Sequence, residues 1–403
     1  MTANDNIKFA SYRDVAPPGT MDLAYKLSEG LQGKTMLHVN STRWGGGVAE
    51  MLHRIIPLLR DLGLDVRWDV IEGSSEFYQV TKAFHNALQG EQQDISPAMY
   101  EAYKETNKKN ARKMDLNADL VVIHDPQPAA LVEKKKKKVP WLWRCHIDAS
   151  HPQRRVWNFL KDYVSRYDGA IFSLPDFAQK LDISQILMYP SIDPLSDKNR
   201  DLTPQEIEAA IGEFNIPRDK PIILQVSRFD RFKDPIGVIQ AYQMIKAGND
   251  CRLILAGGGA ADDPEGRAVL DEVKSAAAQD KDIIILDLPP DAHLVINALQ
   301  RIATIVLQKS LKEGFGLTVA EAMWKGKPVI GGFVGGITVQ IAYGQTGYTV
   351  HSPEGCAYRI RYLLNNPELA RRMGEQAREF TRRNFLITRH LCDYLALLKT
   401  YIG

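Results

Sequence analysis

Short apolar runs recur along the chain, and a longer stretch with apolar residues at helical spacing follows most of them. In the first half, the runs are TMLHVN (35–40), LVVIHD (120–125), PWLWRCHID (140–148), GAIFSL (169–174) and QILMYP (185–190). In the second half, the pattern restarts with PIILQVS (221–227), RLILAG (252–257), IIILDLP (283–289), IATIVLQ (302–308) and GKPVIGG (326–332). Continuous apolar runs that alternate with helices are typical of strands buried on both faces of a parallel sheet. The pattern therefore predicts an α/β fold with two doubly wound, Rossmann-like sheets.

A polar, proline-rich segment interrupts this alternation. PSIDPLSDKNRDLTP (190–204) has no apolar periodicity, which is typical of a linker. A chain of 403 residues is also longer than one ordinary core supports. We therefore predict a first domain at 1–194 and a second at 195–403, facing a central cleft. The last helix, about 385–403, is amphipathic and free to pack back on the first domain.

The charge balance gives no sign of a polyanionic partner. Lys and Arg number 51 against 49 Asp and Glu, for a formal net charge of +2, so nucleic acid is not an expected partner. Four cysteines lie far apart in the sequence, which fits a reducing compartment. The N-terminus does not resemble a signal peptide, and no run approaches about 20 apolar residues. The sequence thus predicts a cytoplasmic protein without membrane contact, and it leaves the oligomeric state open, a homodimer included.

The richest chemistry lies in KSLKEGFGLTVAEAMWKGKPVI (309–330). A strand (302–308), a turn with Gly314 and Gly316, and a helical stretch (317–324) follow one another here. Ligands of open α/β sheets bind in the crevice outside the carboxyl ends of the strands. The turn after this strand is therefore a candidate binding site.

The helix start and two carboxylates suit a ligand that carries both phosphate and hydroxyl groups. Free backbone N–H groups at Leu317 and Thr318 would meet a phosphate. Glu313 lies before the helix and Glu321 about one turn inside it, so the two could hold hydroxyl groups at different depths. A lone glutamate is more often a solvated surface acid, but the flanking glycines favour the binding interpretation.

Two cations and further glycines follow other predicted strands. Arg228 and Lys233, in RFDRFK, could both reach one diphosphate and stabilise its growing charge as a leaving group. The alternative is an exposed basic loop balanced by nearby aspartates. Gly257 would admit a base or a phosphate, or simply form a turn. Gly46 and Gly47 follow the first strand and would likewise allow close approach to an anion or a sugar.

Together these residues form a recognisable set of motifs. R-x-x-x-x-K, then E-G-F-G-L-T-x-x-E-A-M-x-x-G-K-P-V-I and a later T-G-Y, resemble the donor half of retaining nucleotide-sugar glycosyltransferases with the GT-B fold. The resemblance implies that Glu313 contacts hydroxyls of the transferred sugar and that Glu321 holds the ribose. It assigns the diphosphate to Arg228 and Lys233. The residues that we predict to bind the sugar nucleotide are Gly46, Gly47, Gly257, Gly316, Leu317, Thr318 and Glu321.

The first half narrows the resemblance. HVNSTRWGGGVAEMLH, HDPQPA, WLWRCHID and PSIDPLS are similar to the trehalose glycosyltransferring synthases, as are DDPEG and FLITRHL in the second half. This family joins a nucleoside-diphosphate glucose to free glucose, so the resemblance implies trehalose, with its α,α-1,1 linkage, as the product of a reversible reaction. His146 would contact the transferred sugar and complete a catalytic set with Arg228, Lys233 and Glu313. The candidate residues for binding the glucose acceptor are Asp125, Gln127, Arg144, Asp148 and Glu72.

The mechanism that this resemblance implies is a front-face substitution with retention. A double displacement would need a carboxylate at the anomeric carbon, and the resemblance offers none there. No protein-bound metal and no tightly bound cofactor are expected, although free Mg²⁺ could accompany the nucleotide. One residue departs from the family pattern, because Asp234 stands where a glycine is expected after Lys233.

Two other functions remain open at this point. A trehalose phosphorylase would use the same cations for free phosphate, and a non-catalytic sugar-nucleotide-binding regulator would retain part of the set. Retention of both glutamates, the Arg, the Lys and His146 argues against the regulator. The base of the nucleotide, whether uracil, adenine or guanine, is not fixed by the sequence.

Overall fold

The protein consists of two compact units. The structure is a computed structural model that describes residues 7–44, 47–258 and 264–403. One unit comprises Met1–Pro190 with Ile387–Gly403, and the other comprises Ser191–Leu386. The chain thus passes from the first unit to the second at Pro190, where the sequence had predicted a boundary after residue 194.

The first unit is built on a six-stranded parallel sheet in the order β2-β1-β3-β4-β5-β6. Its strands are β1 (Thr35–Asn40), β2 (Asp65–Val70), β3 (Leu120–His124), β4 (Trp141–Cys145), β5 (Gly169–Phe172) and β6 (Ser184–Leu187). Its α-helices are α1 (Thr20–Ser28), α2 (Gly47–Asp61), α3 (Ser75–Leu88), α4 (Pro97–Lys113), α5 (Arg154–Val164) and α14 (Ile387–Ile402). Short 3-10 helices lie at η1 (Phe9–Tyr12), η2 (Ala129–Lys134) and η3 (Pro175–Phe177).

The second unit repeats this architecture with the strand order β12-β11-β10-β7-β8-β9, also parallel. Its strands are β7 (Ile222–Val226), β8 (Arg252–Gly257), β9 (Ile283–Asp287), β10 (Ile305–Gln308), β11 (Val329–Gly332) and β12 (Gly347–Val350). Its α-helices are α6 (Pro204–Ile211), α7 (Pro235–Lys246), α8 (Pro264–Ala277), α9 (His293–Ile302), α10 (Leu317–Trp324), α11 (Ile337–Gln340), α12 (Pro353–Leu364) and α13 (Pro367–Asn384). Two 3-10 helices are η4 (Gly212–Phe214) and η5 (Arg231–Lys233).

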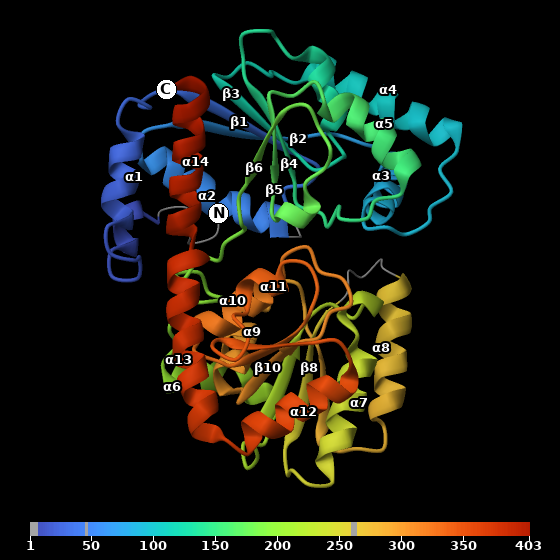
Figure 1. The fold of residues 1–403 in the computed structure, drawn as a ribbon, viewed down its shortest axis with the longest axis vertical. Coiled ribbons are helices and arrows are strands. Elements are labelled where there is room, and N and C mark those ends of the chain that lie inside the picture. The colour runs from blue at the N-terminus through green and yellow to red at the C-terminus, as the bar shows by residue number, and fades with distance from the viewer. Residues whose placement is uncertain (1–6, 45–46, 259–263) are drawn as a thin grey trace. The chain divides into compact units, whose positions relative to one another are not determined.

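Alternate residues of the second sheet enter two separate hydrophobic clusters. Ile223 and Leu253 belong to one cluster, together with residues of α7 and α12. Leu224 and Ile254 belong to the other, together with residues of α9 and α10 (Figure 1). Because successive side chains of a strand point to opposite faces, a strand covered on both sides is apolar throughout. This is the physical reason for the continuous apolar runs in the sequence.

The last helix, α14, belongs to the first unit although the chain reaches it from the second. It packs against α1 and α2, and Figure 1 shows it in red beside the blue α1. Most of one face is buried, including Leu391 and Leu398. Within the part of the chain that the structure describes, no helix combines the length and apolar character needed to cross a membrane.

Candidate functional site

The turn between β10 and α10 is shaped by glycines. Gly316 has a φ of +82°, and a Cβ at this position would lie 3.1 Å from Cγ of Glu313. A Cβ on Gly335 would lie 1.7 Å from the carbonyl oxygen of Glu313, so a second loop passes directly against the turn. Gln340 links the turn to this second loop, since its Nε2 donates to the carbonyl oxygens of Phe315, at 2.5 Å, and Gly336, at 3.1 Å. The glycines around Gly335 therefore serve loop packing.

Glu313 and Lys233, predicted from two separate motifs, lie in direct contact. Lys233 Nζ donates to Glu313 Oε2 at 2.7 Å, and both side chains are largely buried, at 16% and 11% exposure. Ser310 Oγ and Gln308 Nε2 also donate to Oε2, at 3.1 and 3.4 Å. All of these contacts use one oxygen, so the arrangement fixes the carboxylate while directing Oε1 elsewhere. The ammonium of Lys233 is held at the same point.

The contacts of Asp234 account for an aspartate at a position where the family pattern has glycine. Its backbone has a φ of +50°, a left-handed conformation that favours glycine and tolerates aspartate. Oδ1 accepts from the backbone N–H of Gly237 at 3.1 Å and caps α7. Oδ2 pairs with Nζ of Lys309, whose side chain is 4% exposed. The carboxylate thus caps the helix and neutralises Lys309, and these two contacts offset the strain of the left-handed backbone.

Replacing Asp234 with glycine is expected to destabilise the protein by about 2 kcal/mol, although glycine suits the backbone. Loss of the helix cap to glycine costs only a few tenths of a kcal/mol. Most of the expected loss comes from the unpaired buried ammonium at Lys309, which costs more than the relief of backbone strain returns. The urea midpoint of the single variant measures the loss. The double variant Asp234→Gly with Lys309→Met should recover most of it, and equal midpoints for the two variants would contradict the pairing argument.

Arg228 lies apart from the Lys233 pair. Its side chain is 69% exposed and forms a 3.1 Å ion pair with Asp230, while Asp230 Oδ1 accepts from the backbone N–H of Lys233. Asp230 therefore links the two predicted phosphate ligands. Gly257 ends β8, and a Cβ there would lie 1.7 Å from the carbonyl oxygen of Ser227, so close packing of this loop already requires a glycine.

Glu321 is a buried acid with an unsatisfied oxygen. The residue is 2% exposed, and its Oε2 has no hydrogen-bond partner among the described residues. Oε1 lies 3.7 Å from Nζ of Lys198. Buried polar atoms are almost always hydrogen-bonded, so Oε2 is suited to accept from a ligand hydroxyl. Leu317 and Thr318 begin the same helix.

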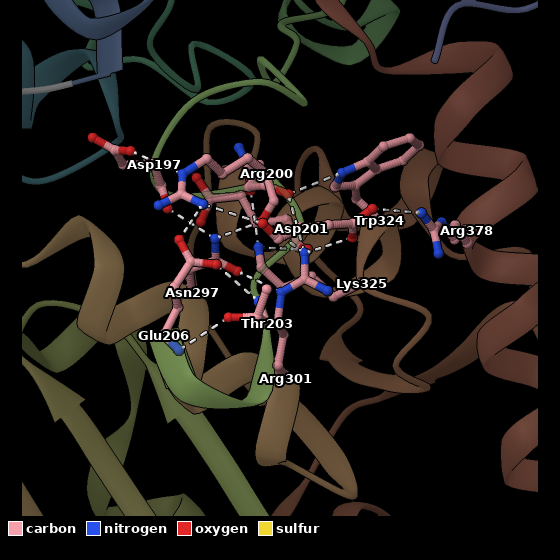
Figure 2. A network of polar contacts seen from close by, with 12 residues as sticks. Asp197, Arg200, Asp201, Thr203, Glu206, Asn297, Arg301, Trp324, Lys325 and Arg378 are labelled. Atoms are coloured by element: carbon pink, nitrogen blue, oxygen red, sulfur yellow. Dashed lines mark hydrogen bonds and ion pairs between the residues drawn. The ribbon is translucent and has the colours of Figure 1, made fainter. Parts of the chain in front are cut away.

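The segment predicted as a linker is instead fixed to the second unit. Asn297 of α9 donates to the carbonyl oxygens of Asp197 and Arg200, at 2.8 and 2.9 Å, and Arg301 of the same helix donates to that of Arg200 at 2.8 Å. Trp324, the last residue of α10, and Lys325, which follows it, bind Asn199 within the same segment, at 3.2 and 2.9 Å. Figure 2 shows these side chains gathered around the segment. The network places Lys198 beside Glu321.

In the first unit, the ends of β3 and β4 are joined through Asp125. Its Oδ1 accepts from the backbone N–H of His146 at 2.8 Å, and its own N–H donates to the carbonyl oxygen of Arg144 at 2.8 Å. Asp125 has a φ of +64°. Burial raises the pKa of its carboxyl to about 7, against the opposing effects of the His146 N–H and the Arg144 charge.

This raised pKa has a testable consequence for stability. Between about pH 4 and 7 the folded protein binds more protons at Asp125 than the unfolded chain does, so this group's stabilising contribution falls as pH rises through that range. We therefore compare the free energy of unfolding of Asp125→Asn with that of the parent protein at pH 5 and at pH 8. The difference should shift in favour of the variant by about 1 kcal/mol or more at pH 8. Urea unfolding at both pH values measures the difference. The same change in stability at both pH values would contradict the raised pKa.

Arg144 lies inside the first unit. It is 1% exposed, and its Nη1 contacts the hydroxyl of Tyr394, His390 Nε2 at 3.0 Å and Met188 Sδ at 3.2 Å. A role in holding α14 and the ends of β4 together suits this placement better than the predicted contact with the acceptor. The reason is that α14, far away in the sequence, covers the guanidinium.

Among the described residues, no hydrogen bond or ion pair joins the remaining predicted acceptor residues to one another. Glu72 is 78% exposed at its side chain and pairs with Lys113 Nζ at 3.0 Å, beside a hollow of about 260 Å³. Asp148 Oδ1 accepts from the N–H and hydroxyl of Ser150. Gln127 Oε1 is buried without a hydrogen-bond partner in the described parts of the chain. Of the glycine turn, Gly47 begins α2, and Gly46 lies outside the described residues.

Two family models match the chain, one in each unit. The model described as "Trehalose synthase, N-terminal domain" matches residues 38–179, and the model described as "Glycosyl transferases group 1" matches residues 206–380. A trehalose synthase from Pyrococcus horikoshii is 46% identical over 402 residues, which cover 98% of this chain and 97% of the relative. The chain belongs to the trehalose synthase family.

More distant similarities set this trehalose synthase family member among other enzymes. A trehalose phosphorylase from Pleurotus pulmonarius is 30% identical over 424 residues, which cover 91% of this chain but 57% of the relative. The solved UDP-forming α,α-trehalose-phosphate synthase from Burkholderia xenovorans superposes with a TM-score of 0.73 at 14% identity, covering 92% of this chain and 100% of the other. The predicted GT-B fold class, with two Rossmann-like domains, is confirmed. The chain is a trehalose-related glycosyltransferase.

Several residues that contact the candidate site residues or their neighbours were not predicted from the sequence. Lys198 lies in a segment whose composition predicts a linker, and Lys309 begins the stretch at 309–330 but has no predicted role. His38 and His124 lie within apolar runs that predict buried strands, so they had no predicted role. A signal was available for the histidines, since each stands among the last residues of a neighbouring strand, where side chains of parallel strands meet.

Proposed function

We propose that this trehalose synthase family member transfers glucose from a nucleoside-diphosphate glucose to free glucose, with retention, giving α,α-1,1-linked trehalose. The observation that carries the proposal is the buried Oε2 of Glu321, an acceptor without a partner among the described residues, on the helix that begins at Leu317. A ribose hydroxyl would satisfy this oxygen. A diphosphate would then lie within reach of the free N–H groups at the helix start.

The pair of Lys233 and Glu313 supports the proposal from the other side of the β10–α10 turn. Oε2 of Glu313 holds the ammonium of Lys233 at 2.7 Å, and its Oε1 is available for a hydroxyl of the transferred glucose. Arg228 and Lys233 would bind the diphosphate, and the exposed guanidinium of Arg228 is free to turn from Asp230 to a phosphate. Both cations would stabilise the charge that grows on the leaving group.

The proposed step balances without an additional reactant. The bond between the anomeric carbon and the diphosphate oxygen breaks, and a bond to the incoming glucose hydroxyl oxygen forms on the same face. The hydroxyl proton passes to the departing diphosphate. No protein carboxylate needs to attack the anomeric carbon, and Glu313 remains a hydroxyl ligand throughout.

The first unit is proposed to bind glucose through side chains at the ends of β3 and β4. Gln127 offers a buried, unpartnered Oε1, and Asp125 and Asp148 are further hydroxyl ligands that we propose. His146 is proposed to contact a sugar hydroxyl. The cysteines are free and buried, which suits the cytoplasmic location that we propose.

A panel of UDP-, ADP- and GDP-glucose with free glucose as acceptor tests the proposed function. We expect trehalose from at least one nucleotide sugar, and linkage analysis should give α,α-1,1. The reverse reaction, trehalose with a nucleoside diphosphate, should release the nucleotide sugar. Binding of nucleotide sugars without turnover would indicate a regulator and overturn the proposal.

The trehalose phosphorylase alternative is separated by the same reagents. Trehalose mixed with inorganic phosphate would yield glucose 1-phosphate if phosphate replaced the nucleotide. The chain is 30% identical to the phosphorylase and covers 57% of it, whereas it is 46% identical to the Pyrococcus horikoshii trehalose synthase. This difference favours the nucleotide-dependent reaction. Formation of glucose 1-phosphate without any use of nucleotide sugars would reverse this choice.

A further inference from the structure

Three histidines in the first unit form a continuous chain of hydrogen bonds. His38 of β1 and His124 of β3 are fully buried, and His146, directly after β4, is half-buried. His38 Nδ1 lies 2.9 Å from His124 Nε2, and His124 Nδ1 lies 3.0 Å from His146 Nε2. Adjacent rings are stacked, with centroids 5.2 and 5.3 Å apart. The chain therefore links the interior of the sheet to a proposed ligand residue.

All three imidazoles are held neutral. Burial lowers the pKa of His38 to about 3 and lowers those of His124 and His146 well below the usual value for histidine. The nearby positive charge of Arg144 acts in the same direction on all three. A neutral imidazole has one N–H and one lone pair, so each ring can donate through one nitrogen only.

Only two arrangements of the protons satisfy both hydrogen bonds. In the first, every ring carries its proton on Nδ1, so His38 donates to His124, His124 donates to His146, and His146 presents Nδ1–H outward. In the second, every ring carries its proton on Nε2, the bonds run the other way, and His146 presents a lone pair. The two differ at the buried end of the chain, because His38 Nε2 is a lone pair in one and an N–H in the other.

The buried end selects the first arrangement. His38 Nε2 has no hydrogen-bond partner among the described residues, and a buried N–H without an acceptor is rarer and more costly than an unused lone pair. Tyr394 contacts both His38, with ring centroids 5.6 Å apart, and Arg144, whose guanidinium carbon lies 5.3 Å from the ring. A positive charge in this cluster favours a lone pair over an N–H at His38 Nε2.

We infer that His38 and His124 are positioning residues that hold His146 as the Nδ1–H tautomer, a hydrogen-bond donor to an oxygen of the sugar ligand. That the ligand is a sugar rests on the proposed function, whereas the tautomer does not. Asp125 orients the same residue by accepting from its backbone N–H at 2.8 Å. The backbone and the ring of His146 are thus fixed by separate contacts, one from the end of β3 and one along the histidine chain.

Long-range ¹H–¹⁵N correlation spectra of the ligand-free, ¹⁵N-histidine-labelled full chain test the tautomers directly. We expect His38, His124 and His146 each to show a protonated-type Nδ1 and an unprotonated-type Nε2 at pH 7, with signals assigned by single-histidine variants. A protonated Nε2 on His146, or an imidazolium, would overturn the inference. This measurement needs no substrate, so it stands even if trehalose is not the product.

Two variants of His124 separate positioning from simple support of the fold. His124→Phe removes both hydrogen bonds, and we expect His146 then to show averaged tautomer shifts and kcat to fall about tenfold. In His124→Asn the amide nitrogen takes the place of Nδ1 and can still donate to His146, so the Nδ1–H tautomer should persist and kcat should stay within about threefold. An unchanged His146 tautomer in His124→Phe would contradict the inference.

A matched control lies on the same strand. Leu120, at the start of β3, is fully buried and four positions from His124, so Leu120→Ala lowers stability without touching the chain of histidines. Its kcat and the His146 shifts should remain those of the parent protein. If His124→Phe does not fold, His38→Phe interrupts the chain at its buried end and should release the tautomers of His124 and His146. Fixed tautomers in that variant would equally overturn the inference.

Discussion

Replacing Glu313 with glutamine is expected to lower kcat for trehalose formation about 100-fold. The carboxylate accepts from Lys233, Ser310 and Gln308 through one oxygen, and an amide cannot balance the ammonium at 2.7 Å. The variant loses a charge-assisted hydrogen bond to the proposed substrate hydroxyl and also the position of Lys233, which together account for about 2.7 kcal/mol of activation free energy. Steady-state kinetics with the best nucleotide sugar measure the loss.

Two further variants define what this loss means. Glu272→Gln, on the exposed face of α8, is the surface control and should retain the parent kcat. If Glu313 acts partly through Lys233, the double variant Glu313→Gln with Lys233→Met should lose less than the sum of the two single losses. Full additivity would show that the two side chains act independently. A Glu313→Gln enzyme with parental kcat would remove Glu313 from the proposed site.

Replacing Glu321 with glutamine is expected to raise the KM for the nucleotide sugar about 30-fold with a smaller effect on kcat. The buried Oε2 is the acceptor that we assign to the ribose, and losing one charge-assisted hydrogen bond costs about 2 kcal/mol. The amide also leaves Lys198, 3.7 Å from Oε1, without its counter-charge. Initial rates over a range of nucleotide-sugar concentrations give the two constants.

Free nucleoside diphosphate provides the control for this second prediction. Calorimetry should show the same loss of affinity for the nucleoside diphosphate as for the nucleotide sugar, because the ribose is common to both. Binding of glucose should be unchanged. Equal affinity of Glu321→Gln and the parent protein for the nucleoside diphosphate would place the ribose elsewhere.

The parts of the site that sequence reasoning found are local. Glu313, Gly316 and the start of α10 at Leu317 follow one another in the chain, so a strand, a turn and a helix place them together without any distant contact. Lys233 required a second motif, and its 2.7 Å contact with Glu313 is the point at which the two motifs meet. The resemblance to the glycosyltransferase motifs predicted that both residues belong to one site. The physical reason is that β7 and β10, which precede the two residues, are neighbouring parallel strands in the sheet.

Arg144 shows what a position at a strand end leaves open. Its position at the end of β4 suggested a ligand contact, but α14 places Tyr394 and His390 over the guanidinium. The amphipathic pattern of the last helix showed only that one face would be covered. Which unit it would cover, and which polar residues would lie beneath, depended on packing.

The sequence by itself determined the two parallel sheets, the family and the glycine-shaped turn, because periodicity, turn chemistry and motif spacing act between residues close in the chain. The tertiary structure alone decided the pairing of Asp234 with Lys309, the placement of Lys198 beside Glu321 and the histidine chain from His38 to His146. Each of these joins side chains from separate elements, and burial forces them to find partners. Partner choice among buried polar groups depends on which strands, helices and loops lie side by side in the fold, and that arrangement is not encoded in local patterns.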